Sequence, residues 1–150
     1  MKIHIILEGK LRKSRALNWF NEYQKRLSGY TPLELSEWST PSVAKEERFF
    51  NTLKPGDRLV ALDVNGRSFD SIELAKYFDE LAVNYRTLYI FLGEANGHSE
   101  TVLKYVKEKW SLSALTMSYE VALIVIAEQL YRNMTIRTGH PYHKRGGCSI

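Results

Sequence analysis

Apolar residues along this chain alternate between strand-like and helix-like spacing from one end to the other. Apolar residues recur every three or four positions in five segments, which predicts helices over about residues 16–27, 41–53, 72–82, 99–109 and 119–137. Strands are expected between them, at residues 2–7, 33–36, 59–62, 88–92 and 112–117. The runs 59–62 and 88–92 are apolar at every position, which is typical of strands buried on both faces. This alternation indicates an α/β fold with a mostly parallel sheet flanked by helices.

Boundary signals support several of these elements. Thr40 followed by Pro41 predicts a helix N-cap with proline at the first helical position. Gly29 and Gly139 stand directly after helical patterns and are expected to end them. No fixed-period repeat, low-complexity tract or Gly/Ser linker divides the sequence, so one domain over residues 1–150 is expected.

The last predicted helix contains an apolar run, residues 121–127, that covers its whole circumference. Such a helix must be covered on more than one side, and the sheet of so small a domain covers only one. A two-fold copy of the chain is the simplest second cover, so we expect a homodimer. A central helix in an α+β core is the alternative.

Composition limits the compartment and the class of protein. With 44% hydrophobic and 25% charged residues, and no apolar run of about 18 residues, the chain reads as globular without a membrane partner. The apolar start at residues 1–7 is too short for a signal-peptide core, and Glu8 follows it. The one cysteine, Cys148, excludes an intrachain disulfide and a cysteine-based metal site. We expect a cytoplasmic protein.

The net charge of +4 and the isoelectric point of about 9.1 mildly favour a polyanionic partner such as nucleic acid. Basic residues near the C-terminus interleave with Tyr131, Tyr142 and His143, a combination that suits phosphate contacts with base stacking on RNA. A solvated basic face is the alternative. The four histidines do not have the spacing of zinc ligands, so no metal is expected.

Ligands of parallel α/β sheets bind beyond the carboxyl ends of the strands. That rule selects three segments here: residues 63–68, 93–98 and 112–117. Glycines at both ends of the segment from Gly93 to Gly97 allow a ligand to approach the backbone closely, although an ordinary strand-to-helix turn is the alternative. The residues alone therefore indicate a dimeric α/β protein that binds a nucleotide or RNA.

Several motifs, taken together in their order and spacing, identify a family. The matching segments are residues 91–93, 96–97, 111–116, 128–132 and 139–144. They closely resemble the RlmH family, the ribosomal large-subunit pseudouridine N3-methyltransferases of the SPOUT superfamily. Weaker similarity at residues 9–11, 23–27, 62–63 and 66–68 extends the resemblance over nearly the whole chain.

The resemblance implies a single SPOUT methyltransferase domain, a C-terminal trefoil knot and a homodimer. It further implies S-adenosyl-L-methionine as methyl donor, no metal, and N3 of a pseudouridine in 23S rRNA as acceptor, reached within the assembled ribosome. The positions that match the family's cofactor-binding segments are Leu62, Gly93, Leu112, Ser113, Ala114, Leu115, Thr116 and Met117.

We hypothesise roles for the residues of the C-terminal motifs. His143 is the candidate general base, because imidazole groups titrate near neutral pH. Tyr142 is expected to stack on the base or hydrogen-bond it, and Arg132 to hold a phosphate in the catalytic site. The residues expected to contact rRNA are Arg132, Arg137, Lys144 and Arg145. A tail that merely packs across the dimer is the alternative.

The sequence departs from the family pattern at three places. Glu94 stands where the family usually has a second glycine. Ser118-Tyr119 stands where it usually has Pro-His, and the arginine usual soon afterwards is absent from residues 121–124. Residues 145–150 extend beyond the His-Lys or His-Arg pair at which the family typically ends. The alternative function is therefore a divergent RNA- or ribosome-binding SPOUT relative that lacks methyl transfer.

Overall fold

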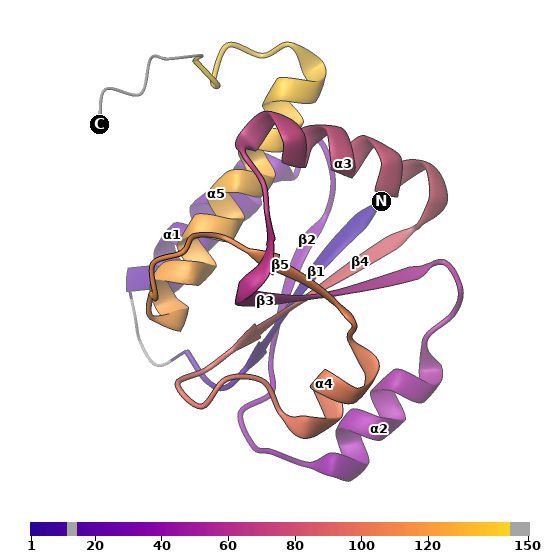
Figure 1. The fold of residues 1–150 in the computed structure, drawn as a ribbon. Helices are drawn as coiled ribbons and strands as arrows, with labels where there is room; N and C mark the ends of the chain where they lie inside the picture. The colour runs from indigo at the N-terminus through magenta and orange to yellow at the C-terminus, as the bar shows by residue number, and fades with distance from the viewer. Residues whose placement is uncertain (12–14, 145–150) are drawn as a thin grey trace.

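The structure, a computed structural model, describes residues 1–11 and 15–144. Within them, five strands form one sheet in the order β2-β1-β4-β3-β5, and every neighbouring pair is parallel (Figure 1). The strands are β1 (Lys2–Glu8), β2 (Leu33–Glu37), β3 (Asp57–Ser68), β4 (Thr87–Gly93) and β5 (Glu108–Ser111). The expected α/β fold with a parallel sheet flanked by helices is confirmed.

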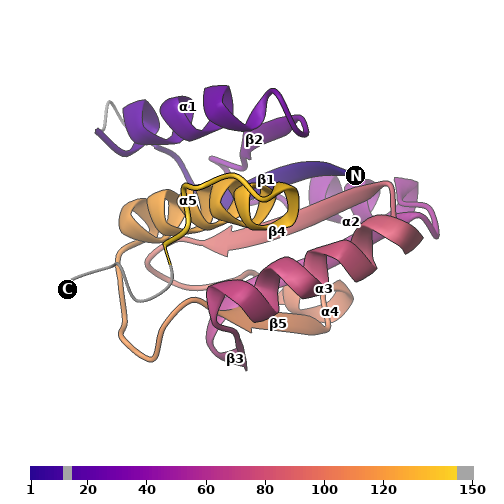
Figure 2. The ribbon, with the colours of Figure 1, turned by 90° about the horizontal axis from the view of Figure 1, so that it is seen from above.

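Helices cover both faces of the sheet (Figure 2). They are α1 (Arg15–Leu27), α2 (Val43–Thr52), α3 (Ser71–Asn84), α4 (Glu100–Tyr105) and α5 (Tyr119–Thr138). The larger core cluster lies between one face and α1, α3 and α5, and includes Phe20, Phe78 and Leu123. The smaller cluster joins the other face to α2 and α4 through Phe50 and Val102.

α5 lies against α1 and α3 as well as against β4. These neighbours bury Leu123, Ile126 and Ala127 completely, so much of the apolar circumference is covered within one chain. Val121 keeps 48% of its surface exposed at the start of the helix. The helix ends at Gly139, which has the left-handed φ of 75° that favours glycine, as the sequence predicts.

The predicted start of α2 is wrong by two residues. Ser42, rather than Thr40, is the N-cap, and its hydroxyl accepts a hydrogen bond from the Lys45 amide at 3.3 Å. Pro41 therefore precedes the helix. Val43, expected on the apolar face, is exposed because it occupies the first turn beyond the sheet.

The predicted boundary between the fourth helix and the fifth strand is also wrong. α4 ends at Tyr105, and the strand is Glu108–Ser111, so residues 112–117 form a loop after it. β5 is an edge strand whose first residues are charged, and it presents one large apolar side chain, Trp110, to the core. So short a strand has no alternating pattern that would distinguish it from the end of a helix.

β3 continues beyond the apolar run 59–62, so the predicted loop at 63–68 belongs to an irregular strand. Leu62 and Arg67 both lie opposite Trp110, and the residues between them bulge out. A Cβ atom at Gly66 would lie 2.6 Å from the carbonyl carbon of Lys109, so glycine permits this close approach. No helix in the described ranges is long and apolar enough to cross a membrane. The knot and the single-domain assignment stay predictions.

Candidate active site

A cavity of about 820 Å³ lies at the carboxyl ends of β3 and β4 and is closed by the first turn of α5. Its wall includes the ends of both strands, residues 94–98, most of the loop 112–118, and Tyr119 and Ala122 of α5. The structure thus brings together seven of the eight residues predicted to bind the cofactor: Leu62, Gly93, Leu112, Ser113, Leu115, Thr116 and Met117. Ala114 lies on the same loop but does not line the cavity.

Two glycines shape the loop after β4. A Cβ atom at Gly93 would lie 2.7 Å from the carbonyl carbon of Gly97, and real Cβ atoms do not approach backbone so closely. Gly97 has a φ of 76°, and its amide donates a hydrogen bond to the Glu94 carbonyl at 2.8 Å. The tight turn therefore depends on glycine at both positions and lets a ligand approach the backbone.

The loop 112–118 is held by serine side chains. Leu115 N–H donates to the Ser113 hydroxyl at 3.0 Å, and the Ser111 hydroxyl donates to the Ser113 carbonyl at 3.1 Å. Leu115 itself is 75% exposed although it lines the cavity. An exposed leucine held at the mouth of a cavity is available to contact a bound ligand.

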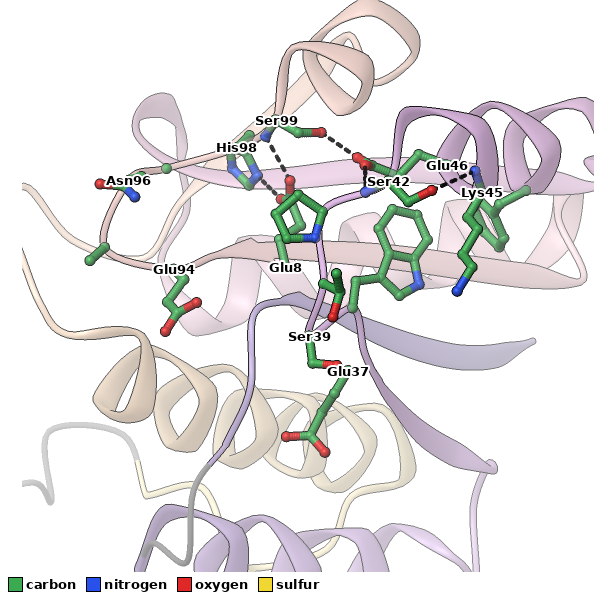
Figure 3. A pocket seen from close by; sticks show the side chains of 16 residues that line it. Glu8, Glu37, Ser39, Ser42, Lys45, Glu46, Glu94, Asn96, His98 and Ser99 are labelled. Atoms are coloured by element: carbon green, nitrogen blue, oxygen red, sulfur yellow. Dashed lines mark hydrogen bonds and ion pairs between the residues drawn. The ribbon is translucent and has the colours of Figure 1, made fainter.

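The carboxylate of Glu94, the departure from the family pattern, lies beside Gly9. A Cβ atom on Gly9 would be 2.2 Å from the Glu94 Oε2 atom, so glycine leaves the space that this carboxylate occupies. Glu94 also lines a second cavity of about 590 Å³, on the far side of residues 94–98 and toward α2 (Figure 3). The two cavities share the wall formed by residues 94–98.

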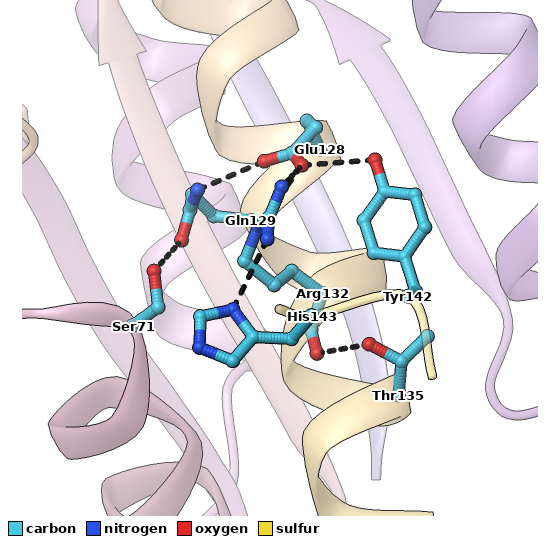
Figure 4. Close-up of polar contacts among 7 residues, drawn as sticks. All are labelled: Ser71, Glu128, Gln129, Arg132, Thr135, Tyr142 and His143. Atoms are coloured by element: carbon cyan, nitrogen blue, oxygen red, sulfur yellow. Dashed lines mark hydrogen bonds and ion pairs between the residues drawn. The ribbon is translucent and has the colours of Figure 1, made fainter. Parts of the chain in front are cut away.

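A polar cluster surrounds Glu128, in the middle of α5 (Figure 4). The Glu128 carboxylate accepts hydrogen bonds from Arg132 Nη2 at 2.6 Å, Gln129 Nε2 at 2.8 Å and the Tyr142 hydroxyl at 3.0 Å. Gln129 in turn accepts a hydrogen bond from the Ser71 hydroxyl at 2.8 Å, which ties the cluster to the start of α3.

The tail after Gly139 folds back so that two of its side chains join this cluster. The Arg132 guanidinium lies 4.9 Å from the centroid of the Tyr142 ring and contacts His143 Nδ1 at 3.1 Å. Because arginine only donates, Nδ1 of His143 accepts, and the proton of the neutral ring stands on Nε2. Burial and the charge of Glu128 raise the pKa of Tyr142 above its ordinary value.

The three predicted catalytic residues, Arg132, Tyr142 and His143, therefore lie together. None of the three lines the cofactor-sized cavity. Of the other residues predicted to bind RNA, Arg137 pairs with Asp79 at 2.5 Å, Lys144 is exposed, and Arg145 lies outside the described residues. No cluster of three or more metal-ligating side chains occurs among residues 1–11 and 15–144.

Sequence reasoning missed three residues of these sites. Glu128 belongs to a quoted motif, and its i, i+4 spacing to Arg132 was the signal that it would pair there. His98 and Glu8 form a buried pair beneath the loop after β4. Glu8 and His98 are 90 positions apart, so no local pattern connects them.

Comparison with known proteins agrees with this geometry. Residues 1–143 match the family model described as "Predicted SPOUT methyltransferase". The cavity at the strand ends of the parallel sheet, closed by the last helix, lies within this matched region. A structure titled as a probable methylase family protein from Haemophilus influenzae Rd KW20 shares the fold, with a TM-score of 0.57 at 15% identity over 95% of this chain and 70% of that one. The fold and the family model define a SPOUT methyltransferase.

Curated relatives narrow that class. A protein of Gloeobacter violaceus is 35% identical over 95% of this chain and 99% of its own length, and one of Xylella fastidiosa is 37% identical over 96% and 98%. Both are named "Ribosomal RNA large subunit methyltransferase H". The chain belongs to this family, as the sequence motifs predict.

Proposed function

We propose that this protein transfers a methyl group from S-adenosyl-L-methionine to N3 of a pseudouridine in large-subunit rRNA, in the cytoplasm and within the assembled ribosome. One observation carries the proposal. In a chain of this methyltransferase family, a cavity of cofactor size lies at the start of α5, and a cluster of arginine, histidine and tyrosine lies beside the second half of the same helix.

The first cavity fits the cofactor in size and in lining. Its 820 Å³ falls within the range of about 300–1,000 Å³ that is usual for small-molecule sites. Leu62, Leu112 and Met117 offer apolar walls for the adenine, and the turn at Gly93 exposes backbone for polar contacts. When bound, the cofactor supplies an electrophilic methyl group on a positively charged sulfur.

The separation of the two sites supports a homodimer. Tyr119 lines the cavity, whereas Arg132 belongs to the polar cluster thirteen residues further along α5, or about 20 Å at 1.5 Å per residue. Methyl transfer requires reacting atoms about 3–3.5 Å apart. The cluster of one chain therefore serves the cavity of its partner. Val121 at 48% exposure and Trp19 at 52% supply apolar surface for the association.

The polar cluster acts on the RNA. Arg132 holds Nδ1 of His143 until a phosphate of the substrate draws the guanidinium away. Nδ1 then accepts the proton of the pseudouridine N3 as a general base. Tyr142 keeps its proton, because its pKa is raised, so it contacts the base as a ring and a donor rather than as a base. Lys144 and Arg137 add phosphate contacts.

A tritium-methyl transfer assay on assembled ribosomes, separate subunits and free RNA tests the activity and the state of the substrate together. We expect label in the large-subunit rRNA of assembled ribosomes. Calorimetry with the cofactor separates the alternative, a relative that binds RNA without transfer. The absence of binding at millimolar cofactor would favour that alternative, and restored binding in Glu94→Gly would assign the loss to the Glu94 carboxylate.

Mixed dimers test the shared active site. Arg132→Ala disrupts the cluster and Gly93→Ala distorts the cavity, and each variant alone is expected to be nearly inactive at cofactor concentrations well below the dissociation constant of Gly93→Ala. If each site combines two chains, random mixing restores about a quarter of the wild-type rate, because half of the dimers carry one intact site. No recovery after mixing would place both parts of the site in one chain.

A further inference from the structure

His98 is a largely buried residue of the wall that the cofactor-sized cavity shares with the second cavity. Only 6% of its side chain and 7% of the Glu8 side chain are exposed. His98 Nε2 lies 2.7 Å from the Leu62 carbonyl oxygen, and its Nδ1 contacts the carboxylate of Glu8, toward which the ring points in Figure 3. The ring thus connects the loop after β4 with the ends of β3 and β1.

Leu62 lies where the sheet opens to form the cavity. β3 pairs with β4 as far as Ala61, opposite Phe91, and goes no further along it. The register of β3 against β5 shifts directly after Leu62. At this point of separation the His98 ring supplies a hydrogen bond to the Leu62 carbonyl. The position of Leu62, and of the bulged residues after it in the cavity wall, therefore depends on a side chain as well as on the sheet.

The two partners of His98 determine its protonation. A carbonyl oxygen only accepts hydrogen bonds, and so does an ionised carboxylate. Both ring nitrogens therefore donate, which makes His98 an imidazolium paired with Glu8. Burial by itself lowers the pKa of His98. The hydrogen bonds to Glu8 and Leu62 and the negative charges of Glu8 and Asp63 raise it by more than burial lowers it, so the pKa of His98 lies above its ordinary value.

Other charged groups face this pair from each neighbouring element. Asp63 of β3 is 3.8 Å from Lys109 of β5, which partly balances it. Glu46 of α2 accepts a hydrogen bond from the Ser99 hydroxyl at 2.5 Å. The second oxygen of Glu8 accepts from the Ser99 amide at 2.8 Å. Glu94 lies on the same loop as His98. The surroundings are predominantly acidic and favour a cation at this position.

We propose that His98 is a positioning residue for cofactor binding. Its ring, hydrogen-bonded through one nitrogen to Glu8 and through the other to Leu62, fixes the position of Leu62 and makes cofactor affinity depend on pH. The inference rests on the proposed function, because it takes S-adenosyl-L-methionine as the ligand. A neutral ring has one N–H for two acceptors, so either Leu62 or Glu8 loses its bond. Since the pKa is raised, the positioned state is complete below the ordinary value near 6.5 and is lost as pH rises through the raised value.

The experiment is calorimetry of S-adenosyl-L-methionine binding between about pH 6 and pH 9.5. At each pH the dissociation constant of the wild type is divided by that of His98→Gln. This ratio is expected to rise about tenfold from the acidic to the alkaline end of the range. Glutamine keeps one N–H donor for the Leu62 carbonyl but does not change its protonation. The amino group of the ligand changes protonation in the same way in the experiments on both proteins, so the ratio cancels its effect. His4→Gln is the matched control: His4 is also part-buried on β1, but it bonds Ser36 and lies outside the cavity.

Glu8→Gln gives a second, independent reading, since it removes the counter-charge and is expected to move the midpoint of the profile to lower pH. Circular dichroism at each pH verifies that every variant is folded. A wild-type profile that parallels His98→Gln, or a Glu8→Gln midpoint that does not move, overturns the role of His98 while leaving the proposed function intact. A wild type that binds no cofactor at any pH overturns the proposed function, and the role of His98 with it.

Discussion

The first turn and the middle of α5 are built in different ways. At its start, Tyr119 and Ala122 close a cavity whose remaining wall is formed by strand ends, the glycine turn after β4 and the loop after β5. In its middle, Glu128 and Arg132 project into a cluster of side chains that the tail completes. The shape of this wall should therefore determine cofactor binding, and the side-chain chemistry of the cluster should determine transfer. The difference implies that binding and transfer can be lost separately.

The largest expected effect is a loss of methyl transfer without a loss of cofactor binding, in Glu128→Gln. This change removes the negative charge that accepts from Arg132 at 2.6 Å and from Tyr142 at 3.0 Å, so the cluster loses its shared anchor. The single-turnover rate of methyl transfer to ribosomes should fall about 100-fold, the lower end of what positioned acid–base groups contribute. Cofactor affinity by calorimetry should not change.

Glu47→Gln is the control for that loss. Glu47 also accepts hydrogen bonds from a tyrosine and a basic side chain, Tyr105 and Lys104, but on the opposite face of the sheet. Its replacement should leave the transfer rate unchanged. An equal loss of rate in the two variants would contradict a special role for the cluster around Glu128.

The opposite effect, a loss of cofactor binding without a loss of RNA binding, is expected from Gly93→Ala. The added methyl group would lie 2.7 Å from the Gly97 backbone, and such overpacking costs about 1–3 kcal/mol. Cofactor affinity should weaken about tenfold or more, and RNA binding measured by filter retention should persist. Gly29→Ala, where nothing lies within 4 Å of the added atom, is the matched control. Unchanged affinity in Gly93→Ala would show that the turn does not shape the cofactor site.

The same contrast explains what could be predicted from the sequence. The carboxyl ends of parallel strands meet at one edge of a sheet, so apolar runs alone placed Leu62, Gly93 and the loop 112–117 near one another. Periodicity failed at residues 106–111, because the edge strand β5 begins with charged residues and is too short to alternate. The error did not change the predicted position of the site, because residues 112–117 follow β5 and lie at the carboxyl ends of the strands.

Side-chain contacts across the chain were beyond local reasoning. The pairing of Glu128 with Arg132 follows from helical spacing, but its bond to Tyr142 depends on how the tail turns back after Gly139. Glu8 marks the end of a strand, and nothing near it in sequence indicates that a histidine will be buried against it. Such residues are found when β1, β3 and the loop after β4 are seen together.

A smaller effect is expected at Asn133, the residue after Arg132 on α5. Asn133 is fully buried, and in the described part of the chain its side-chain nitrogen and oxygen have no hydrogen-bond partner. Asn133→Leu removes an unpaired polar group of similar size, which should stabilise the fold by about 1–3 kcal/mol. Thermal unfolding should show the gain, and transfer should be unaffected. Asn51→Leu, on the exposed side of α2, should show no gain. A destabilised Asn133→Leu would indicate that α5 needs this amide.

The smallest effect is expected for Arg137, near the end of α5. Its pair with Asp79, which is 59% exposed, should contribute less than about 1 kcal/mol to stability. If Arg137 contacts a phosphate, Arg137→Ala should lower the slope of log affinity for rRNA against log salt by about one, at equal cofactor affinity. Asp79→Asn removes the competing carboxylate and should strengthen rRNA binding. Lys104→Ala, the same loss of charge on the opposite face, should leave the slope unchanged. Equal slopes for wild type and Arg137→Ala would remove Arg137 from the RNA interface.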